Sequence, residues 1–373
     1  MLDDGTARVT TSVLSIGKFY HPRSGGVEIV TQEIAEEAAR RGARSTVLCF
    51  DESAEGETTV GGVRVVRYRA RMVGPAPLSL RFLRELRSHA AAADTIVLHY
   101  PNPLAEAGHM LLGGARPRTI VFYHGDLVRY RFPVDRLYWA FSRAALRSAD
   151  TIVTTSPSYA AGSPVLRHME DRIRVVPLAT DTDRFMPRKD ADPPRIPFPR
   201  RILFVGRFSR FKGLDVLIGS LRRLPPDCGV VLIGDGPLRG SVEALRDRLG
   251  LGARVMMPGV IPNADLARWY NACHVFVLPS TLRSESFGVV SLEAMACGLP
   301  IVTTELGTGT TLYNRDGVTG RVAPPGDEKA LAAAIADCLV KGETYGRAGR
   351  LAVERHYSLP AFRTAIGDLL GLH

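Results

Sequence analysis

The sequence predicts an α/β protein built from two doubly wound domains, and three observations lead to this prediction. Its 373 residues are enough for two domains of ordinary size. In both halves, short apolar runs alternate with segments of helical periodicity, as expected for parallel strands that are covered by helices. Residues 190–199 contain four prolines and no periodicity, which predicts a linker between the halves.

The first half opens with an expected strand followed by an amphipathic helix. The helix starts at Gly25–Gly26, and its basic last turn is followed by Gly42, a common residue after a helix end. Further helices are expected at residues 78–91 and 130–147. Apolar runs predict strands at residues 13–17, 46–50, 63–68, 94–100, 119–123, 151–154 and 173–176.

The helix expected at residues 78–91 has two faces. One face carries leucines and is expected to lie against a core, while another carries an arginine at every third position. The residues are Leu80, Leu83 and Leu86, and Arg81, Arg84 and Arg87. Such a helix either lies on an anionic lipid surface or presents an ordinary solvated face.

The second half repeats the alternation of strands and helices. Strands are expected at residues 202–205, 230–234, 255–259, 274–278, 300–303 and 320–326. Helices are expected at residues 214–221 and 265–272, from about Gly288, twice between residues 326 and 356, and at residues 359–372.

Composition and charge limit the possible functions. No run of about 18 apolar residues is present, and the first twelve residues lack the apolar segment of a signal peptide. The five cysteines are scattered and form no C-x-x-C, which suits a reducing compartment and argues against a zinc site. We therefore expect a cytoplasmic protein.

The net charge of +10 is concentrated in one segment. Residues 64–147 contain 14 arginines and 5 acidic residues, a net charge of +9. Nucleic acid and an anionic membrane surface are the candidate partners. No nucleic-acid-binding motif accompanies the charge, so the membrane is favoured and no nucleic acid partner is expected. The alternative is that arginine serves only surface solubility.

Two glutamates, Glu285 and Glu293, lie between two expected strands. One continuous helix would separate them by about 12 Å and rotate them by about 80°, too far apart for one small ligand. If the helix begins near Gly288, Glu285 lies in the loop before it, and both carboxylates reach one pocket at the carboxyl ends of the strands. The backbone N–H groups of Phe287, Gly288 and Val289 would then be free for a phosphate.

This stretch resembles the E-x7-E signature of retaining GT-B glycosyltransferases. The full sequence around the two glutamates, S-E-S-F-G-V-V-S-L-E-A-M-A-C-G-L-P-I-V, resembles glycosyltransferase family 4. The resemblance covers nearly the whole chain. It implies two doubly wound Rossmann-like domains facing a cleft: an acceptor-binding domain at residues 1–185, a nucleotide-sugar-binding domain at residues 186–355, and a helix at residues 356–373 that crosses back. Without a shared pocket, Glu285 is a solvated side chain and Glu293 a helix cap.

Two cations, Arg207 and Lys212, lie in the stretch G-R-F-S-R-F-K-G, between a strand and a helix. A pair of cations on a loop that leads into a helix is suited to a diphosphate. The stretch resembles the family motif G-R-x-x-x-x-K-G. Otherwise the two residues are ordinary surface cations.

Several glycines and one histidine follow expected strands. Gly25–Gly26 is not G-x-G-x-x-G, so the dinucleotide fingerprint is missing, but G-G-V-E resembles the family's glycine loop. Y-H-G-D resembles its active-site histidine motif, which assigns His124 to the transferred sugar and Asp126, more weakly, to the acceptor side. The resemblance places the donor beside Gly25, Gly26, Gly234, Gly259, Val260, Phe287, Gly288 and Val289.

The resemblance also implies a mechanism. Arg207 and Lys212 hold the diphosphate, Glu293 accepts the ribose hydroxyls, Glu285 binds the sugar hydroxyls, and His124 contacts the sugar from the other domain. The departing phosphate serves as the base in a front-face reaction. No metal or other cofactor is expected.

An acidic D-x-D pattern, Asp181–Asp183, binds a metal in another glycosyltransferase fold, but here it falls in a stretch that resembles the family's exit from the first domain. We therefore assign it no metal. Ala179 stands where the family usually has Gly.

The combination of Y-H-G-D, Y-P-N-P-L-A-E and L-R-S-E-S-F-G-V-V resembles bacterial mannosyltransferases of polysaccharide and O-antigen assembly. It implies GDP-mannose as the donor, a polyprenyl-diphosphate-linked glycan as the acceptor, and a peripheral location on the inner face of the plasma membrane. A UDP-sugar is the alternative donor. A nucleotide-sugar epimerase of the same fold, which needs no acceptor, and a non-catalytic glycan- or lipid-binding module also stay open.

Overall fold

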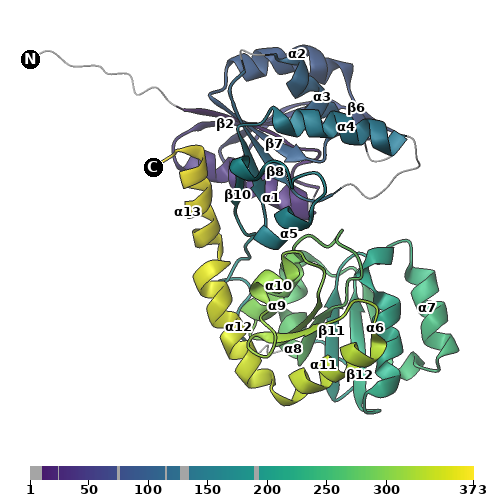
Figure 1. Ribbon diagram of the computed structural model, residues 1–373. Coiled ribbons are helices and arrows are strands. Elements are labelled where there is room, and N and C mark those ends of the chain that lie inside the picture. Colours follow the sequence, from purple (N-terminus) through teal and green to yellow (C-terminus); the bar gives the residue numbers. More distant parts are fainter. Residues whose placement is uncertain (1–10, 24, 74–75, 114–115, 127–133, 189–192) are drawn as a thin grey trace, which may run out of the picture. The chain divides into compact units, whose positions relative to one another are not determined.

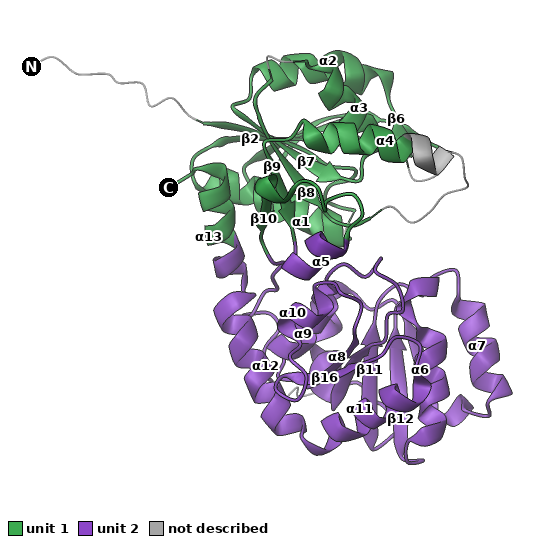
Figure 2. Cartoon of the chain, viewed as in Figure 1, with its two compact units in different colours: residues 1–154, 163–176, 363–373 green, residues 155–162, 177–362 purple. Residues whose placement is uncertain are grey.

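The computed structural model describes residues 11–373, apart from residues 24, 74–75, 114–115, 127–133 and 189–192 (Figure 1). The chain divides into two compact units (Figure 2). Unit 1 comprises residues 1–154, 163–176 and 363–373, and unit 2 comprises residues 155–162 and 177–362. The predicted helix start at residue 130 and the first residues of the predicted linker lie outside the described residues.

Unit 1 contains an eight-stranded sheet in the order β10-β9-β8-β7-β1-β2-β4-β3. Neighbouring strands are parallel, except that β3 runs antiparallel to β4 at the edge. In chain order the strands are β1 (Ser12–Ile16), β2 (Arg44–Asp51), β3 (Gly56–Val60), β4 (Val63–Arg69), β7 (Thr95–Tyr100), β8 (Arg118–Tyr123), β9 (Thr151–Thr154) and β10 (Ile173–Val175). The seven strands expected here are confirmed. β3 was missed because its sequence, G-E-T-T-V, is polar and its residues are largely exposed.

The helices of unit 1 are α1 (Gly26–Arg40), α2 (Leu80–Ala91), α3 (Pro103–Leu111) and α4 (Val134–Arg147), and a short ribbon of β5 (Arg71–Val73) and β6 (Ala76–Leu78) precedes α2. The prediction for the apolar face of α2 was wrong in part. Leu80 is 73% exposed, and Phe82 is buried in its place, together with Leu86 and Ala90. The buried stripe therefore includes Leu86 as predicted, but it continues through Phe82 and Ala90 rather than through Leu80.

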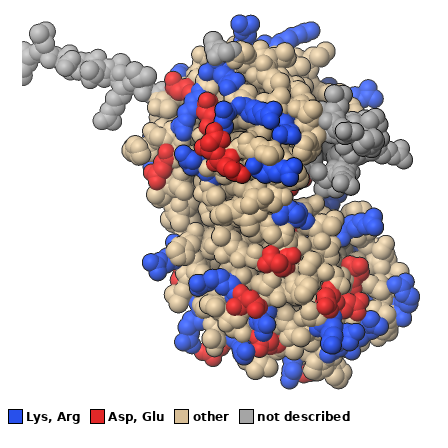
Figure 3. Space-filling view, in the orientation of Figure 1, with Lys and Arg blue, Asp and Glu red and all other residues tan. Residues whose placement is uncertain are grey.

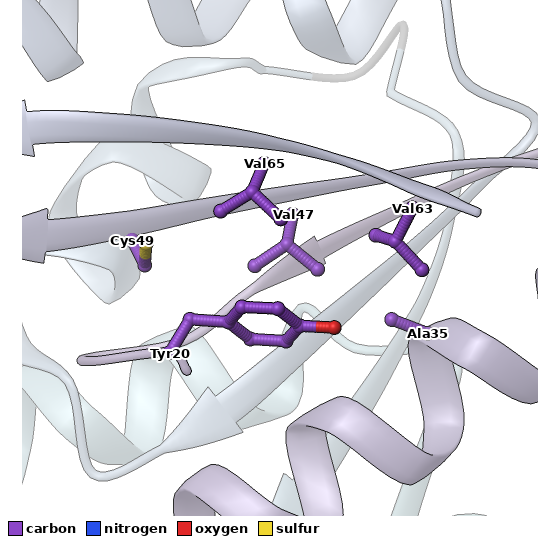
Figure 4. Close-up of a cluster of buried hydrophobic side chains, with 6 residues drawn as sticks. All are labelled: Tyr20, Ala35, Val47, Cys49, Val63 and Val65. Carbon is purple, nitrogen blue, oxygen red and sulfur yellow. The ribbon is translucent and has the colours of Figure 1, made fainter. Parts of the chain in front are cut away.

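A cluster of buried side chains joins α1 to the sheet and fixes the loop after β1. In the view of Figure 4, Tyr20, from this loop, lies with its ring below Val47 and Val65, and Ala35 of α1 lies beside its hydroxyl end. Cys49 and Val63 complete the cluster. The contact holds the loop that leads to Gly25 against the body of the unit.

The last residues of the chain belong to unit 1 and dock on α1. Helix α13 (Leu359–Leu370) buries Ile366 and Leu370. The Arg363 guanidinium pairs with Glu33 of α1 at 3.0 Å, and Arg41 donates to the carbonyl of Leu372 at 2.6 Å.

Unit 2 contains a six-stranded, fully parallel sheet in the order β13-β12-β11-β14-β15-β16. Its strands are β11 (Arg200–Val205), β12 (Cys228–Ile233), β13 (Val255–Gly259), β14 (Val275–Leu278), β15 (Ile301–Thr304) and β16 (Gly320–Ala323). Its helices are α5 (Pro157–Gly162), α6 (Leu214–Ser220), α7 (Arg239–Arg248), α8 (Leu266–Ala272), α9 (Val289–Ala296), α10 (Thr310–Tyr313), α11 (Glu328–Val340) and α12 (Gly342–His356). These strands confirm the alternation predicted for the second half. No helix among the described residues is long and apolar enough to cross a bilayer.

Candidate active site

In unit 2, the strand order reverses between β11 and β14. From β11 the chain proceeds through β12 and β13 on one side, and then through β14, β15 and β16 on the other. The loops that follow β11 and β14 therefore border a topological switch point, where open α/β sheets bind ligands. The first loop carries Arg207 and Lys212, and the second carries Glu285.

Lys212 and Glu285 form an ion pair across these two loops. Lys212 Nζ lies 2.6 Å from Glu285 Oε2, and the two side chains are only 12% and 8% exposed. Ser280 Oγ donates to the same carboxylate oxygen at 2.8 Å. Two predicted site residues, 73 positions apart in the sequence, are thus brought into direct contact. A partly buried lysine and a carboxylate at this edge provide charge for a phosphate and acceptors for hydroxyl groups.

Glycines allow the loops after β11 and β12 to approach each other closely. Gly234 has a φ of +129°, and a Cβ at this position would collide with the carbonyl oxygen of Gly206. The backbone N–H of Phe208 donates to the Asp235 carbonyl at 2.8 Å. The predicted donor-bordering Gly234 therefore also serves the packing of the loop that carries Arg207.

Helix α9 begins at Val289, directly after Gly288, as the analysis of the glutamate pair predicted. Gly288 has a φ of +78°, which favours glycine. Tyr313 donates to the carbonyl of Phe287 at 2.6 Å. Among the described residues, no group accepts a hydrogen bond from the backbone N–H groups of residues 287–289. These donors at a helix start are suited to an anion.

Glu293 lies in α9 and is held by Tyr270 of α8. The Tyr270 hydroxyl donates to Glu293 Oε2 at 2.8 Å. Burial raises the pKa of Glu293, and the hydrogen bond from Tyr270 opposes this rise. Because the helix starts after Glu285, the two glutamates occupy a loop and a helix, as predicted.

Three further predicted residues lie at the carboxyl ends of the neighbouring strands. Arg207 is exposed after β11. Gly259 is the last residue of β13, with a φ of +87°, and its carbonyl accepts from the Gly234 N–H at 2.8 Å. Val260 is 72% exposed, which suits contact with a flat ring of a ligand.

In unit 1, Gly25 and Gly26 lie at the start of α1, after β1. The strand order of this unit reverses between β1 and β7, so this loop also borders a switch point. Gly25 is the N-cap residue, and a Cβ at this position would collide with the Glu28 carboxylate. The side chain of Glu28 thus lies over the predicted glycine loop.

His124 and Asp126 follow β8 in the same unit. The backbone N–H of His124 donates to the carbonyl of Tyr100 at 3.1 Å, and the imidazole ring of His124 contacts that of His99. Asp126 Oδ1 accepts hydrogen bonds from Tyr123 at 2.8 Å and Ser163 at 2.6 Å. Asp126 is therefore held by its own unit, which gives it a structural role beside the acceptor-side role predicted for it.

Sequence reasoning missed the residues that support the predicted site. Ser280 lies in the same loop as Glu285, whereas Tyr270 and His99 bond their predicted partners from other elements, and no motif marks any of the three. The D-x-D pattern is explained by the backbone, because Asp181 Oδ1 accepts from the N–H groups of Asp183 and Arg184, both at 3.0 Å. Asp181 thus caps a turn.

Two family models match the chain. The model described as Glycosyltransferase Family 4 matches residues 24–184, and the model described as Glycosyl transferases group 1 matches residues 188–354. Together they account for both units of the fold.

The chain is also similar to known proteins over nearly its full length. An O-antigen chain mannosyltransferase C of Escherichia coli is 33% identical over 351 residues, covering 90% of this chain and 91% of that protein. A D-rhamnosyltransferase of Pseudomonas aeruginosa is 33% identical over 320 residues, covering 83% and 82%. A GDP-mannose-dependent alpha-(1-6)-phosphatidylinositol monomannoside mannosyltransferase of Mycolicibacterium smegmatis is 28% identical over 381 residues, covering 91% and 92%.

Among solved structures, sucrose-phosphate synthase from Thermosynechococcus elongatus matches with a TM-score of 0.82 at 24% identity. The match covers 96% of this chain and 98% of that chain, and at this identity it concerns the fold.

Proposed function

Because the chain belongs to the GT-B glycosyltransferases, with a group 1 domain preceded by a family 4 domain, we propose that it transfers mannose from GDP-mannose to a lipid-linked glycan, with retention of configuration. The proposed role is in the synthesis of a bacterial cell-surface polysaccharide. The proposed donor and acceptor are more specific than membership of the family implies, because its members differ in both.

The observation that carries the proposal is the convergence of charge and donors at the switch point of unit 2. The Lys212–Glu285 pair, at 2.6 Å, lies on the two loops that border this point. The N–H groups of residues 287–289, for which the described part of the chain offers no acceptor, follow Glu285 in the chain. Cations and helix-start donors suit a diphosphate, and carboxylates suit hydroxyl groups, so the set fits a sugar nucleotide.

In the proposed reaction, the bond between the anomeric carbon and the β-phosphate oxygen breaks. A bond to the acceptor oxygen forms on the same face of the sugar, and the acceptor proton passes to the departing phosphate. Lys212 and Arg207 stabilise the charge that develops on the nucleoside diphosphate. Glu285 binds sugar hydroxyls, Glu293 binds the ribose, and no metal is required.

Two relatives support the choice of mannose and of the acceptor. One is an O-antigen chain mannosyltransferase, and the other is a GDP-mannose-dependent enzyme that acts on a phosphatidylinositol monomannoside. By analogy we assign GDP-mannose to the donor site and a polyprenyl-diphosphate-linked glycan to the acceptor site.

The surface of unit 1 supports a membrane-bound acceptor. Leu78 and Leu80 are 51% and 73% exposed, beside Arg84 and Arg87, which have no acidic partner among the described residues. Arg81 is neutralised in part by Glu85 and Glu55. In the view of Figure 3, basic side chains are spread over this unit, and acidic side chains gather on its left-hand part. Apolar side chains flanked by arginine are suited to contact with anionic lipid.

The first test is calorimetric titration with GDP, UDP and ADP in EDTA. We expect a clear preference for GDP, because the proposed donor is GDP-mannose. A preference for UDP would overturn the mannose assignment but keep the glycosyltransferase reaction. Incubation with GDP-mannose and a polyprenyl-diphosphate-linked acceptor, followed by NMR of the product, then tests retention through the one-bond ¹³C–¹H coupling constant of the anomeric carbon.

The membrane contact is tested by flotation with vesicles of phosphatidylglycerol and phosphatidylcholine. Wild-type protein is expected to float with anionic vesicles, and the variant Arg84→Glu/Arg87→Glu to float several-fold less, since each basic residue contributes about 1 kcal/mol near the surface. The matched variant Arg347→Glu changes an exposed arginine of unit 2 and is expected to bind as wild type does. Equal flotation of all three proteins would refute this contact.

A further inference from the structure

The side chain of His124 lies against a second histidine within unit 1. His99, on β7, is paired with Phe122 of β8, and His124 follows two positions later, so the three side chains lie on one face of the sheet. His99 Nδ1 lies 2.9 Å from His124 Nε2. The two rings are inclined by 10°, and their centroids are 5.2 Å apart.

These values describe an in-plane hydrogen bond rather than a face-to-face stack. The distance between the ring centroids exceeds the distance between the two nitrogen atoms by about the width of one ring. This difference is expected when two coplanar rings lie edge to edge, with a nitrogen of one ring pointing at a nitrogen of the other. A neutral imidazole carries one N–H donor and one acceptor nitrogen. One of the two histidines therefore donates, and the choice fixes the tautomer of both.

The surroundings of His99 decide which ring donates. Its other nitrogen, Nε2, is buried and has no hydrogen-bond partner among the described residues. If His124 donated, His99 would carry its proton on Nε2, as a buried N–H with no acceptor. If His99 donates through Nδ1, Nε2 is only an unused acceptor, which proteins tolerate better than an orphaned N–H. The second arrangement is favoured.

We propose that His99 is a positioning residue, whose Nδ1–H donates to His124 Nε2 and thereby fixes the proton of His124 on Nδ1, as a donor toward an oxygen of the transferred sugar. The sugar contact rests on the function proposed above, whereas the tautomer does not depend on it. His124 is partly exposed and His99 is buried, so the first ring is accessible to a ligand and the second is enclosed behind it.

Burial supports this arrangement, because it keeps both rings neutral. It lowers the pKa of His124 to about 4, and it lowers the pKa of His99 well below its usual value, with His124 as a second cause. Near neutral pH the two rings are then joined by one N–H···N hydrogen bond, and each ring carries one N–H proton.

The tautomer is tested directly by two-bond ¹H–¹⁵N NMR of the full chain labelled in its nine histidines. The His99 and His124 signals are assigned from their loss in the single variants His99→Asn and His124→Gln. We expect His124 to be protonated at Nδ1 in the wild type. Protonation of His124 at Nε2 would overturn the proposal.

Three variants separate positioning from packing. His99→Asn keeps a donor near the position of Nδ1, and His99→Leu removes it. His109→Leu is the matched control, because it removes another fully buried imidazole of unit 1 whose ring nitrogens have no partner among the described residues. We expect His124 to keep its tautomer in His99→Asn and His109→Leu and to lose it in His99→Leu. An unchanged tautomer in His99→Leu would refute the role of His99.

The sugar contact is tested by comparing the affinities for GDP and GDP-mannose. His99→Leu is expected to lose about tenfold in the ratio of the two affinities, roughly the contribution of one hydrogen bond. His99→Asn is expected to stay near the wild-type ratio. A loss for GDP and GDP-mannose alike would indicate a packing defect and refute positioning. If the wild type binds GDP-mannose no better than GDP, the proposed donor contact fails, while NMR still decides the tautomer.

Discussion

Replacing Lys212 by methionine tests whether the ion pair of unit 2 serves stability as well as ligand binding. The substitution keeps most of the side-chain volume but leaves Glu285, only 8% exposed, without its cation. Removing one partner of a buried pair costs about 3–5 kcal/mol. Since Glu285 keeps the hydrogen bond from Ser280, we expect the lower end, about 3 kcal/mol. For a unit of this size, that lowers the unfolding midpoint by about 6–12 °C.

The two tryptophans make the measurement specific, because Trp139 lies in unit 1 and Trp269 in unit 2. In a Trp139→Phe background, fluorescence on heating follows unit 2 alone. The double variant Lys212→Met/Glu285→Gln removes both charges, so its free energy of unfolding should return to within about 1 kcal/mol of the background. Neither Lys212→Met nor the double variant is expected to bind GDP, because both lack the Lys212 cation. Arg222→Met, which breaks an exposed pair with Glu328, is the control and should cost less than about 1 kcal/mol.

Two results would refute this reasoning. A Lys212→Met variant as stable as Arg222→Met would mean that the pair is effectively solvated. A double variant no more stable than Lys212→Met alone would mean that the loss arises from packing rather than from the unpaired carboxylate.

Three further predictions concern both units. Burial raises the pKa of Glu106 to about 7, above about 4.3 for an unfolded chain. The free energy of unfolding of unit 1 should therefore fall as pH rises from about 4 through 7. In Glu106→Gln this dependence on pH, followed by Trp139 fluorescence, should flatten, and an unchanged dependence would exclude Glu106 as its source. Burial also raises the pKa of Glu293, so Glu293→Gln should stabilise unit 2 more at pH 8 than at pH 4 in urea titrations, and the opposite trend would contradict a desolvated carboxylate. Gly234→Ala, at a φ of +129° against the Gly206 carbonyl, should cost about 1–3 kcal/mol and weaken GDP binding by calorimetry, whereas Gly240→Ala, which meets open space, should do neither.

The fold could be predicted from sequence wherever burial is continuous. The strands of both sheets are apolar runs that lie between helices, and this pattern is unambiguous for parallel strands. β3 could not be found this way, because an exposed edge strand such as G-E-T-T-V has no buried face to record. The exposed Leu80 was wrongly assigned to the buried face, because a leucine at helical spacing is compatible with burial but does not require it.

For the site, local sequence predicted the residues but not their partners. Gly288 places the start of α9, and this separates Glu285 from Glu293 as expected. The contact between Lys212 and Glu285 required the strand order of the sheet, which brings together loops that are far apart in the chain. Ser280 and Tyr270 are common residue types in unremarkable contexts, and only the folded chain joins them to the glutamates. The roles of these residues toward a ligand stay predictions.

The docking of residues 363–373 on α1 has a consequence for biosynthesis. Unit 1 is discontinuous, since most of it precedes residue 176 and its last piece follows unit 2. On the ribosome, the sheet of unit 1 emerges first, yet Glu33 and Arg41 meet Arg363 and the Leu372 carbonyl only after unit 2 has been made. Unit 2 is nearly contiguous and is free to fold during synthesis, so α13 can dock on α1 only after the whole of unit 2 has been synthesised.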